Sequence, residues 1–198
     1  MERFFDLIKA LGVGFIVLGL VAFVNTIYQG NPQGILWFCY LGIILIGAGM
    51  FWKNTLLIES QLNILAIPLI IWTADFFYIA ITGNELLGIT NYFFDPSFPI
   101  ISKIISIQHI FTIPVSFFVL HKLKLKKIPH TWRISFIQLI LVFTLSVLLT
   151  NPLDNLNCVY ENCMSFSIPI IPYQIVWFSS MFILVFATNF ILRKIFKT

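Results

Sequence analysis

The chain has few charged residues and therefore little with which to cover a surface in water. Asp, Glu, Lys and Arg make up only 10% of the 198 residues, whereas hydrophobic residues make up 59% and the mean hydropathy is +0.96. Soluble globular domains contain about 25% charged residues. The shortage excludes a water-soluble globule and predicts one integral membrane domain over residues 1–198.

Several sequence motifs of catalytic and metal-binding proteins are also missing. No H-x-x-x-H pair and no C-x-x-C motif occurs, so the sequence predicts neither a metal site nor a bound cofactor. Heptad arrays, internal repeats and low-complexity tracts are absent as well. Cys158 and Cys163 lie close together in the sequence, and either a disulfide or two free thiols is compatible with this spacing.

What the chain does contain is a series of apolar segments long enough to cross a bilayer. A membrane core about 30 Å thick requires about 17 to 25 residues of helix. The sequence predicts an all-α fold, an integral membrane bundle of six transmembrane helices. The expected spans are Ala10–Tyr28, Ile35–Trp52, Leu62–Thr82, Ile104–Leu120, Ile134–Thr150 and Ile170–Leu192.

The basic residues predict how these spans are oriented. The chain has 12 Lys and Arg residues, and all except Lys103 fall on one side of a six-span arrangement. Because cytoplasmic loops are enriched in Lys and Arg, both termini are expected in the cytoplasm. The net charge of +4 therefore reports topology, and no nucleic acid partner is predicted. The cluster Lys122 to Lys127 is expected to lie at anionic lipid headgroups.

Asp75 is the one charged side chain inside the predicted spans, and it lies at nearly the same depth as His109. Each is expected on the order of 10 Å below the outer interface, at about 1.5 Å per helical residue. A carboxylate in hydrocarbon costs several kcal/mol, roughly 2.5 to 3.5, and normally faces a partner or a watery cavity. The sequence therefore predicts a contact between Asp75 and His109.

Other polar side chains are expected at the same level, whereas the inner halves of the spans are mainly Leu, Ile, Phe and Val. This asymmetry favours a polar chamber open to the outer surface. The simpler interpretation is that these groups form hydrogen bonds between helices. The residues predicted to bind a substrate there are Thr73, Tyr78, Thr112, Asn151, Asn155, Asn157 and Gln174.

An Asp and a His in contact can activate a nucleophile. The carboxylate would fix the imidazole tautomer, so that the second nitrogen of His109 serves as a general base. Cys39, near the outer end of the second span, is the predicted nucleophile for acyl transfer, and Thr112 is a weaker candidate. The simpler interpretation of Cys39 is a small apolar residue in a packed helix.

The aromatic loop between the third and fourth spans admits two interpretations. Residues 86–99 contain Tyr92, Phe93, Phe94 and Phe98 together with two prolines. A belt of aromatic side chains at the membrane interface is the usual reason for such a composition. A lid over the polar chamber is the alternative.

Several of these segments resemble a family of uncharacterised bacterial multi-pass membrane proteins, often called membrane-associated proteins in planctomycete-type genomes. The resemblance covers roughly Leu36 to Pro172 and implies no known activity. Its segments are Leu36-Trp37-Phe38-Cys39, Glu59-Ser60-Gln61, Trp72-Thr73-Ala74-Asp75, Thr90 to Asp95, Ser106 to Pro114 and Asn151 to Asn157.

A more distant similarity is to the six-helix membrane hydrolases of fatty acid esters of hydroxy fatty acids and to YwaF-like membrane proteins. That hydrolase family uses a Thr near the start of its second helix and a His in its fourth. His109 matches the second role. The segment Trp37-Phe38-Cys39-Tyr40 has Cys where the family has Thr.

Two classes of function remain open from the sequence. An enzyme would hydrolyse or transfer the acyl group of a lipid ester, with Cys39, His109 and Asp75 as nucleophile, base and orienting acid. A binding, transport or structural protein would use Asp75 and His109 as a polar or proton-relay pair. In both cases the expected partners are membrane lipid and an amphiphilic substrate, and the expected location is a bacterial inner membrane.

Overall fold

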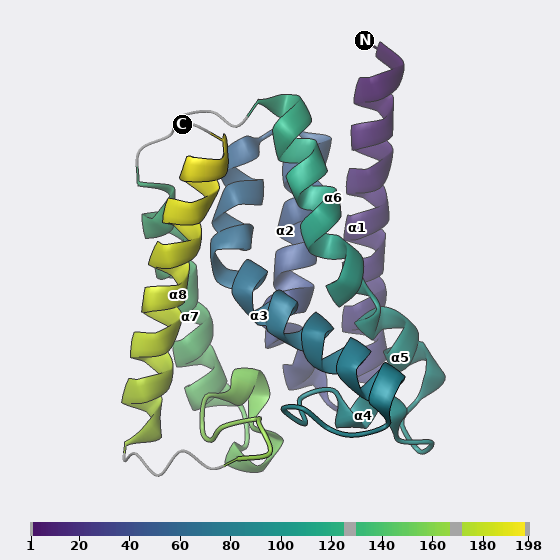
Figure 1. The fold of residues 1–198 in the computed structure, drawn as a ribbon, viewed down its shortest axis with the longest axis vertical. Helices are drawn as coiled ribbons and strands as arrows, with labels where there is room; N and C mark the ends of the chain where they lie inside the picture. The colour runs from purple at the N-terminus through teal and green to yellow at the C-terminus, as the bar shows by residue number, and fades with distance from the viewer. Residues whose placement is uncertain (1, 125–129, 167–171, 197–198) are drawn as a thin grey trace.

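The computed structural model describes residues 2–124, 130–166 and 172–196, and each regular element in these ranges is a helix (Figure 1). The all-α prediction is confirmed for this part of the chain. Ile170, where the sixth span was expected to begin, lies outside the described residues, as do Lys126 and Lys127 of the basic cluster.

Within the described ranges, five helical segments are long and apolar enough to cross a membrane. Two of the helices, α5 and α6, form one such segment because only Ile107 separates them. The segments are α1 (Glu2–Tyr28), α3 (Thr55–Thr82), α5 (Ile100–Ser106) with α6 (Gln108–Leu123), α7 (Thr131–Leu149) and α8 (Tyr173–Phe196).

The second predicted span is divided into two pieces. A short 3-10 helix, η1 (Pro32–Leu36), is followed by α2 (Phe38–Phe51), which has 14 residues. At about 1.5 Å per residue this helix is about 21 Å long, short of a full hydrocarbon core. The structure therefore has five segments of sufficient length and one shorter apolar helix.

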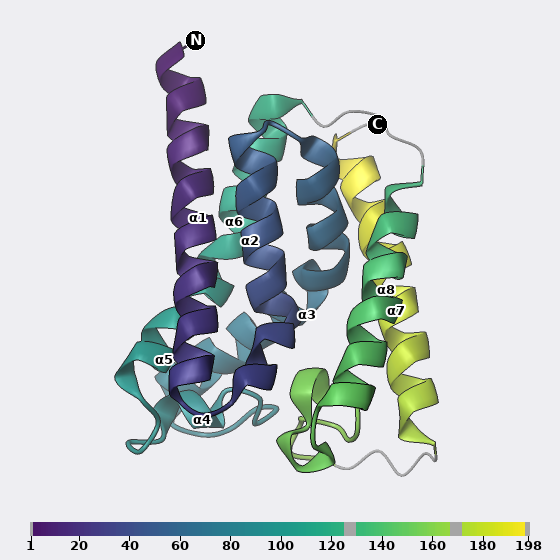
Figure 2. The same ribbon diagram turned by 180° about the vertical axis from the view of Figure 1, so that it is seen from behind.

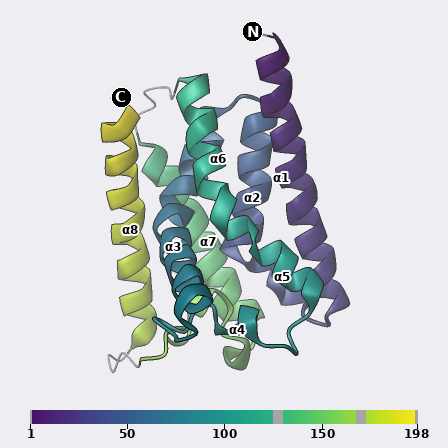
Figure 3. The same cartoon turned by 45° about the vertical axis from the view of Figure 1, so that its right-hand side comes forward.

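The helices run up and down between two ends of the bundle (Figures 1 and 2). The start of α1 and the last turn of α8 lie at one end, called here the terminal end. The loop end, opposite, carries α4 (Asn91–Phe94), η2 (Pro152–Asp154) and η3 (Leu156–Cys158), and Figure 3 shows α4 beneath the long helices there. Helix α3 is central, because it packs against α2, α6, α7 and α8.

Helices α1 and α2 approach closely at a pair of glycines. A Cβ atom added at Gly47 would lie 2.6 Å from the Gly12 carbonyl oxygen and 2.9 Å from the Ile16 amide nitrogen. Small residues allow such backbone contact between apolar helices, where packing replaces the hydrophobic effect as the force of association. The contact fixes α2, and with it the position of Cys39.

Replacing Gly47 with alanine is expected to lower the free energy of unfolding by about 1–3 kcal/mol, because the added methyl group forces the two helices apart. Thermal unfolding in detergent measures this. The matched control is Gly14→Ala, since a Cβ at Gly14 meets nothing within 4 Å. Equal effects of the two substitutions would contradict the close approach.

A proline inside α3 divides this helix into two halves that point in different directions. Pro68 has no amide hydrogen, so the Ile64 carbonyl loses its helical donor, and the proline ring forces the helix to bend. Figure 1 shows the terminal half of α3 beside α8 and the loop half slanting towards α5. The bend leaves space between α3 and α8 at the loop end.

Candidate functional site

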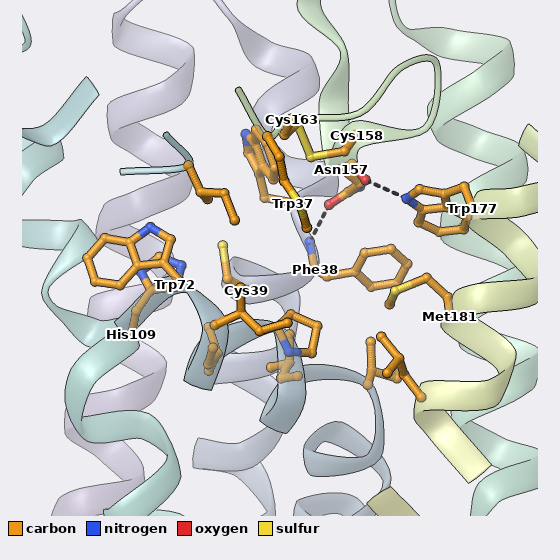
Figure 4. A pocket seen from close by; sticks show the side chains of 18 of the residues that line it. Trp37, Phe38, Cys39, Trp72, His109, Asn157, Cys158, Cys163, Trp177 and Met181 are labelled. Carbon is orange, nitrogen blue, oxygen red and sulfur yellow. Dashed lines mark hydrogen bonds between the residues drawn. A yellow bond between two sulfur atoms is a disulfide. The ribbon is translucent and has the colours of Figure 1, made fainter. Parts of the chain in front are cut away.

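A cavity of about 300 Å³ lies where α3 bends away from α8. Its walls are largely apolar and include Pro68 and Trp72 of α3 and Trp177 and Met181 of α8 (Figure 4). The first turn of α2 and the loop that follows η3 complete it. We call this space the site cavity. An apolar chamber of this size is suited to an alkyl chain or another greasy group.

His109 lies in the wall of the site cavity and is held from two sides. Its ring stacks on Trp72 with the centroids 4.5 Å apart, and Nδ1 lies 2.6 Å from the Ser106 carbonyl oxygen. A carbonyl oxygen can only accept, so Nδ1 carries the proton and Nε2 is the basic nitrogen. Nε2 has no hydrogen-bond partner in the described part of the chain.

Cys39 is the second reactive group of the site cavity. It lies in the first turn of α2, it is a free thiol, and it lines the same cavity as His109 (Figure 4). Figure 4 shows its sulfur directed into the space beside Trp72 and Trp37. The structure thus brings together two of the three residues that the sequence predicted to be catalytic, whereas their catalytic role stays a prediction.

Asp75 is not the partner of His109, and the predicted contact between them is wrong. The Asp75 Oδ1 atom accepts the Leu87 amide hydrogen at 2.7 Å, and Oδ2 accepts the amide and hydroxyl hydrogens of Thr90, each at 2.8 Å. The carboxylate is fully buried and organises the loop that follows α3. The loop after α3 folds back and supplies the donors in place of His109.

Asn157 links four elements around the site cavity. Its Oδ1 accepts the Phe38 amide hydrogen at 3.0 Å, and its Nδ2 donates to the Leu36 carbonyl and the Ser146 hydroxyl. Its own carbonyl accepts from Trp177 Nε1 at 2.9 Å. In the structure the side-chain amide of Asn157 holds the start of α2 in place. Asn157 also lines the site cavity, and its predicted role in substrate binding stays a prediction.

Asn155 organises the loop that forms the roof of the site cavity. Its Oδ1 accepts the amide hydrogens of Tyr160 and Glu161, and its Nδ2 donates to the Glu161 carbonyl. Cys158 and Cys163 form a disulfide across this loop, which settles the open question about the two thiols. Both cysteines line the cavity.

The remaining predicted binding residues lie away from the site cavity. The hydroxyl of Thr112 donates to the Gln108 carbonyl one turn earlier, and Asn151 caps η2. Tyr78 is 40% exposed, and Gln174 is partly exposed on α8. Thr73 lines a second cavity of about 360 Å³ between α3 and α6, whose wall also includes His109. Substrate binding by these residues stays a prediction.

The aromatic loop folds back onto the bundle. The Tyr92 hydroxyl accepts from Trp72 Nε1 at 3.1 Å and donates to the Ser106 hydroxyl at 3.3 Å. Burial raises the pKa of the Tyr92 phenol above its usual value, so it remains a neutral donor. Phe93 and Phe94 pack against Phe76. The loop therefore supports the ring on which His109 stacks.

A second buried polar cluster, at the terminal half of the bundle, was missed by the sequence interpretation. Glu59 is fully buried on α3, and its Oε1 accepts from the Thr131 hydroxyl and from Asn189 Nδ2. Arg193 of α8 lies 3.3 Å from the same oxygen. Asp75 is therefore not the only buried charged group within a membrane-length helix, because α3 begins before Leu62, where the third span was predicted to begin.

Further along α3 and α7, more polar side chains form hydrogen bonds between these two helices. Asn63 donates to the Ser135 hydroxyl, and Gln61 and Gln138 exchange reciprocal hydrogen bonds at 2.7 and 2.9 Å. The sequence signal was the repeated four-residue spacing of Glu59 with Asn63 and of Thr131 with Ser135, which places each pair on one helical face. This cluster joins α3 to α7 and α8.

Comparisons of the chain with protein-family models, with curated proteins and with solved structures found no match. The resemblance to multi-pass membrane proteins and the weaker one to membrane hydrolases therefore stay predictions. The functional argument rests on the geometry of the site cavity.

Proposed function

We propose that the chain is an integral membrane protein with six crossings, in which the shorter α2 completes the sixth, and with both termini in the cytoplasm of a bacterial cell. The positive-inside rule supports this orientation, because Lys53, Arg133 and Arg193 belong to the terminal end. The disulfide at the loop end supports it independently, since disulfides persist in oxidising compartments outside the cytoplasm.

We propose further that the protein transfers or hydrolyses the acyl group of a membrane lipid in the site cavity. The observation that carries this proposal is that Cys39 and His109 line one cavity whose other walls are mainly apolar. The apolar walls suit an acyl chain, and the thiol and the imidazole suit the chemistry of an ester carbonyl.

The proposed reaction has two steps. The Cys39 sulfur attacks the ester carbonyl while its proton passes to His109 Nε2, and the alcohol leaves with that proton as a thioester forms. Water or an acceptor hydroxyl then attacks the thioester, again losing its proton to Nε2, and the Cys39 thiol is restored. The Ser106 carbonyl takes the orienting role that the sequence assigned to Asp75.

A second candidate is binding of a lipid or amphiphile without covalent chemistry. It is favoured by the engagement of Asp75 in the loop, because no carboxylate then supports the imidazolium form of His109. In this case the site cavity would hold the apolar part of the ligand and His109 would contact its polar group.

The test is incubation of the purified protein in nanodiscs with p-nitrophenyl palmitate. Acyl transfer predicts release of p-nitrophenolate and a hydroxylamine-sensitive adduct on the peptide that contains Cys39, and Cys39→Ala is expected to lose both. Cys39→Ser is the matched control for shape. Turnover that survives Cys39→Ala would overturn the nucleophile, and retention of lipid by an unreactive protein would favour the binding candidate.

A further inference from the structure

All three cysteines of the chain line the site cavity. The sequence contains Cys39, Cys158 and Cys163 and no others. Cys39 is a free thiol, Cys158 and Cys163 form a disulfide, and each of the three is partly exposed (Figure 4). A free thiol and a disulfide that line one cavity are the two groups that take part in thiol–disulfide exchange.

A hydrogen bond joins the two residues that precede Cys39 and Cys158 in the sequence. The Phe38 amide donates to the Asn157 side chain at 3.0 Å, and this bond is buried. Cys39 follows Phe38 in the sequence, and Cys158 follows Asn157. The bond therefore joins the segments that carry Cys39 and Cys158, and both cysteines face the same cavity although they are more than 100 positions apart in the sequence.

The loop backbone distinguishes the two sulfurs of the disulfide. Asn157 and Cys158 both have a positive φ, 55° and 57°, a backbone conformation that residues other than glycine rarely adopt. The bonds of Asn157 to α2, α7 and α8 hold this side of the loop over the cavity. Cys158 therefore directly follows the anchored residue Asn157, whereas Cys163 lies 5 positions further along the chain.

A hydrogen bond also favours Cys163 as the leaving group. Asn155 Nδ2 lies 3.6 Å from the Cys163 sulfur and donates to it. A donor at this position stabilises the negative charge that develops on the departing sulfur, and a better leaving thiolate speeds exchange. No corresponding donor to the Cys158 sulfur occurs in the described part of the chain.

We propose that the three cysteines form a thiol–disulfide exchange centre in which Cys39 attacks the sulfur of Cys158. The Cys39 proton passes to His109 Nε2, the Cys158–Cys163 bond breaks, a Cys39–Cys158 bond forms, and Cys163 leaves as a thiolate that takes up the proton. The number of disulfides is unchanged, so the step needs no external oxidant. This activity goes beyond acyl transfer and does not depend on it.

The exchange would move the free thiol from the first turn of α2 to the loop that follows η3. In the exchanged state Cys39 is blocked and Cys163 is free, at a partly exposed position at the loop end. A thiol there can exchange with disulfides of molecules outside the membrane. The same step removes the thiol that acyl transfer would use.

The test traps the mixed disulfide with Cys163→Ser, which removes the leaving sulfur and lets Cys39 and Cys158 pair on air oxidation. The protein in nanodiscs is quenched with acid, alkylated with N-ethylmaleimide and mapped by mass spectrometry without reduction. The expected result is a Cys39–Cys158 linkage in most molecules, with alkylation of Cys39 reduced at least about fivefold relative to the doubly substituted Cys158→Ser, Cys163→Ser protein.

The matched control is Cys158→Ser, which keeps Cys163 as the only loop thiol and is expected to leave Cys39 open to alkylation. Thermal unfolding of all variants confirms that they are folded. Three outcomes overturn the proposal: free Cys39 in the Cys163→Ser protein, linkage between two molecules through Cys158, or equal linkage of Cys39 in both single variants. A minor Cys39–Cys158 peptide from the unmodified protein supports it without any substitution.

Discussion

Replacing His109 with alanine is expected to slow acylation of Cys39 by about 10²–10⁴-fold, the usual contribution of a positioned general base. The Nδ1 proton is committed to the Ser106 carbonyl, so only Nε2 can remove the thiol proton, and alanine offers no substitute. Burst release of p-nitrophenolate from p-nitrophenyl palmitate measures this step directly.

Two controls separate the base from its structural contacts. The His109→Ala substitution also removes the ring that stacks on Trp72, so added imidazole, which can occupy the vacated space, should restore part of the rate. Ser106 contributes its backbone carbonyl, so Ser106→Ala should leave the rate of acylation nearly unchanged. An acylation rate in His109→Ala equal to that of the unmodified protein would refute the assignment of the base.

Replacing Asp75 with alanine is expected to release the loop after α3 and to lower the free energy of unfolding by about 3–5 kcal/mol. The substitution leaves three donors of Leu87 and Thr90 without their acceptor, and each hydrogen bond to a charged group contributes about 1.5–3 kcal/mol. The loss is not fully additive, because the freed donors can reach water. Hydrogen exchange of the Leu87 and Thr90 amides and thermal unfolding measure the effect.

The charge-matched control is Asp154→Ala, because that side chain is exposed at the loop end. This substitution should alter neither hydrogen exchange of the Leu87 and Thr90 amides nor thermal unfolding. If Asp75 instead acted on His109, Asp75→Asn would slow acylation while the Leu87 and Thr90 amides stayed protected. That combination of results would support the contact between Asp75 and His109 that the sequence predicted.

The sequence predicted the all-α class and the long apolar helices, and it named two residues that line the site cavity, Cys39 and His109. Apolar runs located the long helical segments, and counting residues from the span ends put Cys39 slightly shallower than His109, in the same half of the bundle. The position of a helix and the depth of a residue along it depend on hydropathy and on helix rise, which are local properties of the sequence. The partner of Asp75 depends on how residues 84–90 fold back, and no periodic pattern encodes that path.

Glu59 was missed for a different physical reason. Hydropathy favours ending a span at the first charged residue, so the third span was expected to begin at Leu62, whereas α3 begins at Thr55. Burial of Glu59 is tolerated only because Thr131, Asn189 and Arg193 supply donors from two other helices. A single segment of sequence carries no information about such partners.

The bond between Phe38 and Asn157 joins residues 119 positions apart, and this separation bears on how the protein is made. During synthesis α1, α2 and α3 are complete long before Asn157 is added. Until then the Phe38 amide in the first turn of α2 lacks the acceptor that it has in the folded protein. The cavity around Cys39 can be completed only after the segment from α7 to η3 has packed against the start of α2. Formation of the cavity around Cys39 is thus coupled to folding of the last third of the chain.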